Sequence, residues 1–596
     1  TAYRRQRQMC IRDRYYVYSV PEVFRNNIKI GIRVRIPFGK MELEGFVMNI
    51  LNDTDYDKSK IRDISDVVDD RPVLNKEMIL LGKYMSKHLL CSLVSAYQVM
   101  LPKALKAKVN TNIKIKYNKY LRRTKSIEEI DKYISSCKYE GQVNLLCKLK
   151  EGDVLITKMS STINTIIKNG LGEIYLEEDK RYSYTGISNY KRVVLNEEQE
   201  KAKDIVVNSF GDANTYLLYG VTGSGKTEVY MSIIEEALKL GKEAIMLVPE
   251  ISLTPQVVGK FISRFGDVVA VWHSKLSDTE RYDEYRKITT GEAKIVIGTR
   301  SAIFVPFNNI GVIIIDEEHT TSYKQDNNPK YSAIEIAIER AKNNNAIVIL
   351  GSATPSLETY ARSIKGLYTL VELKHRVNTN NLPLVEIVDM SKEKHRGSIF
   401  SSRLITEVNK RLEEHEQIIL LLNRRGYSSF ITCSNCGYTA KCPHCDITLT
   451  YHKTSNTLRC HYCGYADKMN DICPSCGEKA IKTLGTGTEK VEEEIKKVFN
   501  ARVVRMDLDT TSKKGSHEKI ITAFKNHEYD ILLGTQMIAK GLDFSNVTLV
   551  GVINADTSLM IPNYRSNEYT FQLLMQTAGR SGSCLLYTSP SPRDSW

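Results

Sequence analysis

One eight-residue stretch, Gly220 to Thr227 (GVTGSGKT), constrains the fold of this chain more than any other. An apolar run, Thr215 to Tyr219, precedes it, and an amphipathic segment that begins at Glu228 follows it. A glycine loop between a strand and a helix places backbone N–H groups around phosphates, with the lysine on the β- and γ-phosphates and the threonine hydroxyl on Mg²⁺. The alternative is a glycine turn without a ligand. The predicted nucleotide-binding residues are Gly220, Val221, Thr222, Gly223, Ser224, Gly225, Lys226 and Thr227, and Lys226 is also a predicted catalytic residue.

A second stretch, Gly311 to His319 (GVIIIDEEH), supplies acidic groups after an apolar run. The run suits a strand buried on both faces of a parallel sheet, which ends where such sheets bind their ligands. We expect Asp316 to hold Mg²⁺ and Glu317 to position or deprotonate the attacking water. A solvated acidic loop is the alternative. Together with the glycine loop, the stretch predicts an NTP hydrolase.

Length and composition set the frame for these motifs. A chain of 596 residues is expected to hold several domains. Its 84 Lys and Arg residues against 70 Asp and Glu residues give a net charge of +14, which favours a polyanionic partner. The sequence has no apolar run of about 18 residues and no signal-peptide pattern, so we expect a cytoplasmic chain with no membrane partner.

The two ends of the chain have an unusual composition. Residues 1–14 (TAYRRQRQMCIRDR) carry five Arg, and residues 584–596 (CLLYTSPSPRDSW) show neither periodicity nor cap signals. We expect both segments to be non-native tails and leave them out of the fold prediction.

Eight of the thirteen cysteines lie between residues 433 and 476 as four C-x2-C pairs. This number of thiolates suffices for two tetrahedral four-thiolate zinc sites. Redox-active cysteine pairs are the alternative. The spacing alone leaves the pairing of the knuckles open. The predicted metal ligands are Cys433, Cys436, Cys442, Cys445, Cys460, Cys463, Cys473 and Cys476.

The N-terminal third of the chain divides into two predicted domains. In residues 15–105, apolar and basic residues alternate as in a strand, which predicts a small β-barrel-like module. Its positive face and tyrosines suit either stacking on bases or a solvated edge strand. Residues 106–180 hold a pattern of short helices that fits a winged-helix domain, and residues 181–194 are a predicted linker.

The remainder of the chain predicts two α/β lobes. Strand-like and helical segments alternate in residues 195–375, and again in residues 383–430 and 480–583, which is typical of parallel sheets. The cysteine block, residues 431–479, interrupts the second lobe. A nucleotide bound between two such lobes can convert hydrolysis into motion.

The order of the motifs resembles that of the superfamily 2 helicases: Gly220–Thr227, Asp316–His319, Gly351–Pro355, Gly534–Gln536 and Gln576–Arg580. Longer strings resemble more specifically the bacterial PriA (primosomal protein N′) family of replication-restart helicases: GVTGSGKTEVY, LVPEISLTPQ, IVIGTRSAIF, DEEHTTSYKQ, GSATPS, LLNRRGYSS and GTQMIAKGLDF. The resemblance covers residues 15–582. It implies an α/β fold of two RecA-like parallel-sheet helicase lobes with a double zinc-ribbon insertion, preceded by a small β-rich DNA-binding domain and a winged-helix domain.

The resemblance also implies roles for individual residues. A pocket for the 3′ terminus of a nascent strand would contain Tyr16, Tyr18, Gly39 and Arg62. An aromatic-rich loop that couples DNA to ATP hydrolysis would contain Tyr323, Lys324, Gln325 and Tyr331. Gln199 resembles the glutamine that recognises adenine, and the last helicase motif contributes Gln576 to nucleotide binding and Arg580 to catalysis. The zinc knuckles would pair in a nested way, 433/436 with 473/476 and 442/445 with 460/463.

The sequence departs from the family pattern at two positions. Val17 stands where an acidic residue is often found, and Ser583 stands where the family has a final arginine that acts on the γ-phosphate. Such an arginine contributes roughly 10³–10⁵ in rate in other NTPases. We therefore expect a truncated gene product, without the family's C-terminal domain, that binds ATP and hydrolyses it poorly.

The predicted function is that of an ATP-dependent 3′-to-5′ DNA helicase that recognises stalled or abandoned replication forks and initiates primosome assembly. Direction, fork preference and reloading rest on the resemblance alone. The implied cofactors are ATP, Mg²⁺ and two Zn²⁺, and the implied partners are forked or single-stranded DNA, primosome proteins and single-stranded DNA-binding protein. A fork-binding zinc scaffold without ATP turnover and an RNA helicase are the alternatives.

Overall fold

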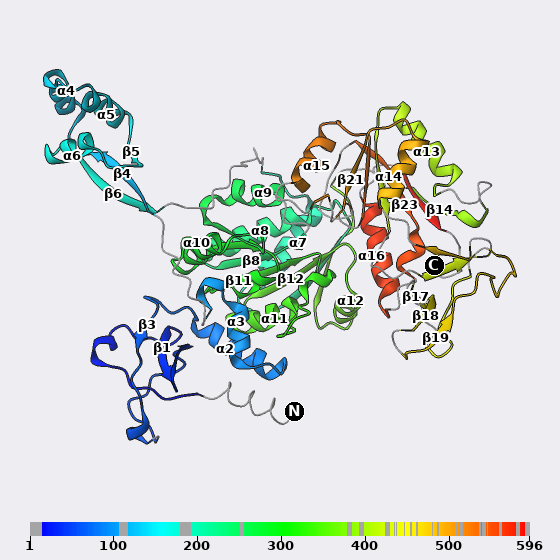
Figure 1. Ribbon diagram of the computed structural model, residues 1–596, viewed down its shortest axis with the longest axis horizontal. Coiled ribbons are helices and arrows are strands. Elements are labelled where there is room, and N and C mark those ends of the chain that lie inside the picture. Colours follow the sequence, from blue (N-terminus) through cyan, green and yellow to red (C-terminus); the bar gives the residue numbers. More distant parts are fainter. Residues whose placement is uncertain are drawn as a thin grey trace.

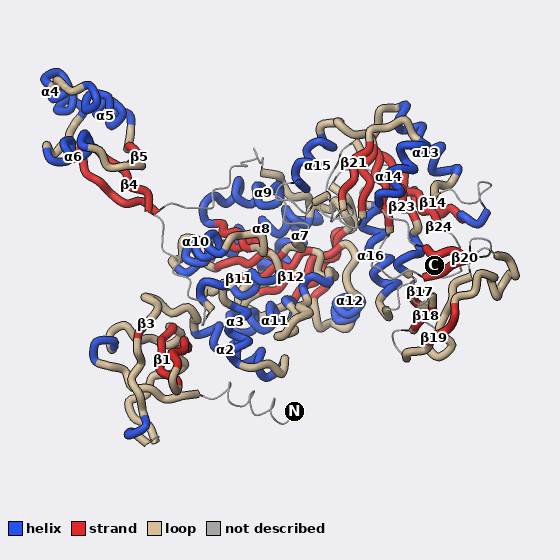
Figure 2. Tube along the Cα trace, in the orientation of Figure 1, coloured by secondary structure: helices blue, strands red, loops and turns tan. Residues whose placement is uncertain are grey.

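Six β-sheets and the helices packed on them make up the described part of the chain in a computed structural model (Figures 1 and 2). None of the described helices has the length and apolar character needed to span a bilayer. Arg580, Ser583 and Gln536 of the predicted motifs lie outside the described residues. The structure describes residues 15–55, 57–106, 117–178, 192–250, 255–377, 384–392, 399–423, 430–433, 436, 438–445, 448–452, 456–460, 463–479, 481–484, 488–507, 510–511, 516–535, 538, 544, 546–559, 563–579 and 584–589.

Lobe 1 is built on a seven-stranded parallel sheet of order β13-β7-β12-β11-β8-β10-β9. All residues of β8, β10 and β12 are buried, as expected for a sheet covered on both faces. The strands are β7 (Thr215–Gly220), β8 (Glu243–Leu247), β9 (Val269–Trp272), β10 (Ile295–Gly298), β11 (Ile310–Asp316), β12 (Ile347–Ser352) and β13 (Thr369–Leu373).

Helices cover both faces of this sheet (Figure 2). One face carries α7 (Glu197–Val207), α8 (Lys226–Lys239) and α9 (Pro255–Phe265), and the other carries α10 (Asp278–Thr289) and α11 (Ala333–Asn344). A further helix, α12 (Leu357–Ile364), follows β12. Short 3-10 turns connect these elements: η4 (Gly266–Val268), η5 (Arg300–Phe304) and η6 (Thr321–Tyr323).

Two helices that precede lobe 1 in the sequence, α2 (Lys76–His88) and α3 (Leu93–Met100), share its hydrophobic core, and η3 (Lys103–Leu105) follows them. The Arg340 guanidinium on α11 is fully buried and donates to both carboxylate oxygens of Glu77 on α2, at 2.8 and 2.7 Å. The Tyr285 hydroxyl donates to the Val73 carbonyl oxygen at 2.6 Å. By its packing, the predicted domain 15–105 therefore splits into a β module and a helical part that is fused to lobe 1.

The N-terminal β module is a three-stranded antiparallel sheet of β1 (Arg33–Phe38), β2 (Met41–Phe46) and β3 (Asp66–Val67). Two 3-10 turns, η1 (Glu22–Phe24) and η2 (Lys58–Lys60), flank the strands, and Ile32, Val34 and Ile64 form the small core. The Phe46 ring lies against Tyr97 of α3 with the ring centroids 6.1 Å apart, so the module contacts the helical part directly.

The predicted winged-helix domain is a three-helix unit on an antiparallel sheet of order β5-β4-β6, which Figure 1 shows apart from the lobes. A capping box at Ser126 and Glu129 begins its first helix. The elements are β4 (Tyr117–Arg123), α4 (Ile127–Ser136), α5 (Glu140–Glu151), β5 (Val154–Ile156), α6 (Ser161–Lys168) and β6 (Gly172–Glu178).

Lobe 2 is built on a second parallel sheet, of order β14-β24-β23-β15-β22-β21. Its strands are β14 (Leu384–Asp389), β15 (Gln417–Leu422), β21 (Val503–Met506), β22 (Ile531–Gly534), β23 (Val547–Ile553) and β24 (Cys584–Ser589). Its helices are α13 (Ser402–Glu413), α14 (Thr488–Val498), α15 (Ser516–Lys525) and α16 (Ser566–Ala578), with the turns η7 (Met390–Lys392) and η8 (Ala555–Ser558).

Strand β24 lies in the segment 584–596, which was left out of the fold prediction as a non-native tail. Cys584–Ser589 pair in parallel with both β14 and β23, while the non-native origin of the tail stays a prediction. The Leu-Leu-Tyr-Thr run has strand propensity, and a strand with neighbours on both sides needs neither a cap nor a turn signal. The absence of such signals was therefore a poor reason to exclude the segment.

The cysteine block lies between β15 and α14 in the chain and forms two small antiparallel sheets, drawn in yellow in Figure 1. The strands are β16 (Phe430–Cys433), β17 (Thr450–His452), β18 (Thr457–Arg459), β19 (Ala466–Lys468) and β20 (Ile481–Leu484).

Candidate nucleotide site and metal centres

The glycine loop connects the end of β7 to the start of α8, as the sequence predicts. Gly223 and Gly225 have φ angles of 82° and 79°, in the left-handed region that favours glycine. The Lys226 ammonium donates to the Gly220 carbonyl oxygen at 2.6 Å, and the Ser224 hydroxyl oxygen is buried without a hydrogen-bond partner in the described structure. A helix N-terminus with an unsatisfied buried hydroxyl and two left-handed glycines in the preceding loop fits a phosphate chain.

Asp316 ends β11 beside this loop and is partly buried. The Tyr230 hydroxyl donates to Asp316 Oδ1 at 3.1 Å, and the Tyr323 hydroxyl donates to the Asp316 carbonyl oxygen at 2.6 Å. Burial, and then the charge of Glu317, raise the pKa of Asp316 to about 6. A carboxylate with a raised pKa gains from a divalent cation, which suits the predicted Mg²⁺ ligand.

Glu317 adopts a φ angle of 49°, a strained conformation for a residue with a side chain. Such strain costs about 1–3 kcal/mol and persists where the surroundings hold the residue in place. Gln576 on α16 provides one such restraint, because its Nε2 donates to Glu317 Oε2 at 2.9 Å. The side chain predicted to act on the attacking water is therefore held by the second lobe.

The same Gln576 joins a chain of polar side chains that runs back into lobe 1. Its Nε2 also lies 2.8 Å from His319 Nε2, and His319 Nδ1 lies 2.8 Å from the Ser352 hydroxyl oxygen. Since an amide nitrogen can only donate, Nε2 of His319 accepts and its Nδ1 carries the proton. Ser352 Oγ also accepts from the Thr354 N–H at 2.9 Å. Three predicted motifs are thus connected by hydrogen bonds.

The C-terminal end of α16 also meets the glycine loop. A Cβ atom on Gly579 would lie 2.6 Å from the Thr222 Cβ, so only glycine fits at this position. Two further contacts join the lobes nearby: Glu568 Oε1 accepts from the Leu357 N–H at 3.0 Å, and the Arg565 guanidinium pairs with Glu358. The last helicase motif therefore lies against the phosphate loop, although its Arg580 is outside the described residues.

Gln199 and Glu318 have well-defined partners. Gln199 Oε1 accepts from the Asn196 N–H at 2.9 Å and its Nε2 donates to the Ser224 carbonyl oxygen at 2.9 Å. One N–H and one lone pair remain for an adenine edge. Glu318 is buried and accepts from the Ser356 N–H at 2.6 Å and the Thr359 hydroxyl at 3.0 Å, so it holds the start of α12 rather than reacting with water.

The predicted aromatic-rich loop is only partly as expected. Tyr323 and Tyr331 are 1% and 2% exposed, so neither ring offers a free face in this structure, and their expected contact with DNA stays a prediction. Tyr331 packs edge-on against Phe304 with the ring centroids 4.8 Å apart. Lys324 is exposed and is the one predicted DNA contact of this loop at the surface.

Two residues that support the site were missed by the sequence analysis. Tyr230 lies one helical turn after Lys226 and holds Asp316, and only its place in the string GKTEVY could have indicated this. Arg300 donates to the Ser322 and Lys324 carbonyl oxygens at 3.1 and 2.6 Å and thereby fixes the aromatic-rich loop. Its partners lie more than twenty residues away, so no local pattern identifies it.

The four residues predicted at a DNA 3′ end gather around the turn between β1 and β2. The Tyr18 hydroxyl donates to the Pro37 carbonyl oxygen at 3.2 Å, and the Tyr16 ring lies edge-on to Phe38 at 5.3 Å. The Arg62 guanidinium lies 3.4 Å from the Gly39 carbonyl oxygen, and Gly39 has a φ of 63°.

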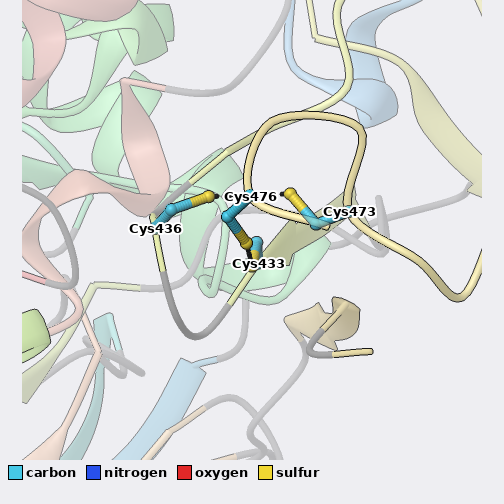
Figure 3. Close-up of side chains that lie close together, drawn as sticks. All are labelled: Cys433, Cys436, Cys473 and Cys476. Carbon is cyan, nitrogen blue, oxygen red and sulfur yellow. Dashed lines mark hydrogen bonds between the residues drawn. The ribbon is translucent and has the colours of Figure 1, made fainter. Parts of the chain in front are cut away.

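The eight cysteines form two groups of four whose ligand atoms all lie within 4.8 Å of one another. One group contains Cys433, Cys436, Cys473 and Cys476, whose sulfurs point toward one another in Figure 3. The other contains Cys442, Cys445, Cys460 and Cys463. The nested pairing implied by the resemblance is confirmed.

The geometry of these groups fits a tetrahedral metal. The sulfurs of Cys433 and Cys476 are 3.7 Å apart, and those of Cys442 and Cys463 are 3.5 Å apart. A tetrahedron with Zn–S bonds of about 2.3 Å has sulfur–sulfur edges of about 3.8 Å. Hydrogen bonding with Cys463, burial, and hydrogen bonding with Cys460 raise the pKa of Cys445 to about 12, so a bound cation would be needed to stabilise its thiolate.

Comparison with known proteins connects these features. The matching family models are described as 3′DNA-binding domain (3′BD) (residues 9–102), DEAD/DEAH box helicase (196–363), PriA DNA helicase Cys-rich region (CRR) domain (442–468) and Helicase conserved C-terminal domain (469–584). Replication restart protein PriA of Bacillus subtilis (strain 168) is 43% identical over 96% of this chain and 80% of its own length. The chain belongs to the PriA family of replication restart proteins.

Other PriA proteins match over a similar extent. That of Chlamydia trachomatis is 37% identical over 95% of this chain and 78% of its own length. A solved structure of RecG bound to a three-way DNA junction has a TM-score of 0.39 and 17% identity over 67% of this chain and 43% of its own, which is too low to support an argument. The helicase and 3′ DNA-binding domains make this PriA family member an ATP-dependent DNA helicase of replication restart.

Proposed function

We propose that this chain hydrolyses ATP between its two lobes in response to a DNA fork, and that it moves 3′ to 5′ on DNA and initiates primosome assembly at stalled or abandoned forks. The observation that carries the proposal is the Gln576 amide, which bonds to both Glu317 and His319 from the opposite lobe. A change in lobe spacing alters these bonds and hence the orientation of the carboxylate beside the attacking water. ATP turnover and lobe movement are therefore coupled.

The nucleotide would be held by residues already placed. Lys226 and Thr227 would hold the phosphates and Mg²⁺, Asp316 would be the second Mg²⁺ ligand, and Gln199 would contact adenine. Mg²⁺ supplies charge neutralisation on the phosphates when bound. The two cysteine groups would each hold one Zn²⁺. The β-module turn would bind the nascent 3′ end, with Lys324 as a further DNA contact.

The proposed partners follow from the proposed task. Forked or single-stranded DNA would be the substrate, primosome proteins and single-stranded DNA-binding protein would be the protein partners, and the cytoplasm would be the location. The basic net charge of +14 supports a nucleic-acid partner.

The test is ATP turnover with and without a forked DNA that carries a 3′ end at the junction. We expect turnover to depend on DNA, to vanish in Lys226→Ala, and to fall about tenfold or more in Gln576→Ala, since that variant frees Glu317 while leaving the phosphate loop intact. Ser583→Arg is expected to raise turnover. Fork binding without turnover in any of these chains would instead favour a zinc scaffold, and preference for duplex RNA over the fork would favour an RNA helicase.

A further inference from the structure

The segment that follows β13 wraps around the phosphate loop. The Val221 N–H donates to the Leu373 carbonyl oxygen at 3.2 Å, and the Val377 N–H donates to the Gly223 carbonyl oxygen at 3.0 Å. Glu198 on α7 accepts from the Lys374 N–H at 2.8 Å and the His375 N–H at 3.3 Å. Residues 374–377, which we call the strap, are therefore held on both sides of Arg376.

Arg376 lies directly over the loop. Its Cγ and Cδ atoms are 3.8 and 3.9 Å from the position that a Cβ on Gly223 would occupy. Gly223 has no side chain and a left-handed backbone, so the aliphatic part of Arg376 rests on bare backbone at the edge of the phosphate cradle. This placement brings a permanent positive charge beside the N-terminus of α8.

The guanidinium of Arg376 lacks a protein acceptor in the part of the chain that the structure describes. Its Nε atom is buried and has no hydrogen-bond partner, and the same is true of the Ser224 hydroxyl in the loop itself. The nearby carboxylate of Glu198 is occupied by the strap's own backbone. A buried N–H donor without an acceptor is costly, and a ligand that accepts from it removes this cost.

Resting on the proposed function, we propose that Arg376 contacts the bound nucleotide and donates a charge-assisted hydrogen bond to its phosphate chain from lobe 1. The contact belongs to the nucleotide-binding lobe itself. It therefore acts independently of the predicted Arg580 of lobe 2, and it stabilises bound ATP and ADP even where the lobes are apart.

The test measures nucleotide affinity rather than turnover. A fluorescent ADP is displaced with ATP and, separately, with inorganic triphosphate, using the unsubstituted chain, Arg376→Gln, Arg376→Lys and Lys374→Gln. One charge-assisted hydrogen bond corresponds to about a 10- to 100-fold change in affinity. We expect Arg376→Gln to weaken ATP and inorganic triphosphate to the same extent, within this range. Arg376→Lys should restore part of the affinity of both.

Lys374→Gln is the matched control. It also removes one positive charge from the strap. The Lys374 side chain is 66% exposed and pairs with Glu372 at 3.2 Å, so the affinity of this variant for ATP and triphosphate should not change. Unchanged affinity of Arg376→Gln, or a loss for ATP alone with triphosphate unaffected, would overturn the phosphate contact. If the unsubstituted chain bound no nucleotide, both the proposed function and this inference would be overturned.

Discussion

Lobe 1 and the cysteine insertion hold their structures together by different means. In lobe 1, seven strands lie between two layers of helices, and the hydrophobic clusters on both faces of the sheet are extensive. The insertion has a small cluster around Ile431, Leu449 and Leu458 and two groups of four thiols. Burial of apolar side chains is therefore expected to stabilise lobe 1, whereas the cysteine insertion is expected to need a bound metal to stay folded.

The largest expected effect is that removal of the metal unfolds the cysteine insertion and leaves lobe 1 folded. Strong chelation, or Cys442→Ser, should unfold the insertion, because structural zinc contributes about 10–16 kcal/mol in zinc-finger peptides. Limited proteolysis should then cut between residues 433 and 476.

The stability of lobe 1 is followed through Trp272, which is the remaining tryptophan once Trp596→Phe is introduced. The thermal unfolding of lobe 1 should not change when the metal is removed. Cys147→Ser, at an exposed cysteine outside both groups, is the control. Simultaneous loss of the Trp272 signal would show that the two regions are not independent.

A second variant should weaken lobe 1 and spare the insertion. Arg340→Ala leaves Glu77 as an unpaired carboxylate in a largely buried position, which typically costs about 3–5 kcal/mol. We expect urea unfolding, followed through Trp272, to shift by this amount while zinc content stays the same.

Arg502 provides the comparison, since it makes the same bidentate contact with Asp530 at the surface. Exposed pairs of this kind contribute about 0–1 kcal/mol. Because Arg502 lies beside β21 of lobe 2, its variant is followed by far-ultraviolet circular dichroism and not through Trp272. A loss of stability as large as that of Arg340→Ala would show that burial is not the reason for the effect.

The smallest effect concerns pH, and it has opposite signs in the two regions. Folding raises the pKa of Asp316 from 3.8 to about 6, so between these values the folded chain binds a proton that the unfolded chain releases. In the absence of nucleotide and Mg²⁺, the contribution of Asp316 to the free energy of unfolding therefore decreases as pH rises through this window. The insertion should show the reverse, since protonation of its thiolates at low pH releases zinc.

The measurement is the difference in unfolding free energy between the unsubstituted chain and Asp316→Asn, with Trp272 as the reporter, from pH 5 to pH 7. The advantage of Asp316→Asn should grow toward pH 7, because asparagine carries no charge to bury. A difference that is constant across this range would contradict the raised pKa.

Local patterns predicted much of this structure. The apolar run Thr215 to Tyr219 forms β7, which extends one residue further to Gly220, and Asp316 ends β11 as expected. Both could be predicted because buried parallel strands and the polar residues at their ends are local features of the sequence. The thiol grouping needed the family resemblance, since spacing permits several pairings.

What local patterns could not supply depends on distant partners. Tyr323 and Tyr331 have the composition of a DNA-contacting loop, and only the Asp316 carbonyl and the Phe304 ring reveal that both are buried. Arg340 and Glu77 are 263 residues apart, so no periodicity links them. Strand β24 was missed because its pairing partners, not its flanking residues, define it.

The shared core of α2, α3 and lobe 1 has a mechanical consequence. The β module packs on these helices, for example through Phe46 and Tyr97, so it is joined to the lobe that carries the phosphate loop. We therefore expect the distance from the β-module turn to the glycine loop to stay constant when the lobes open or close, while its distance to α16 changes. A fork end held at that turn, as proposed, would then serve as a stationary reference point for movements of lobe 2.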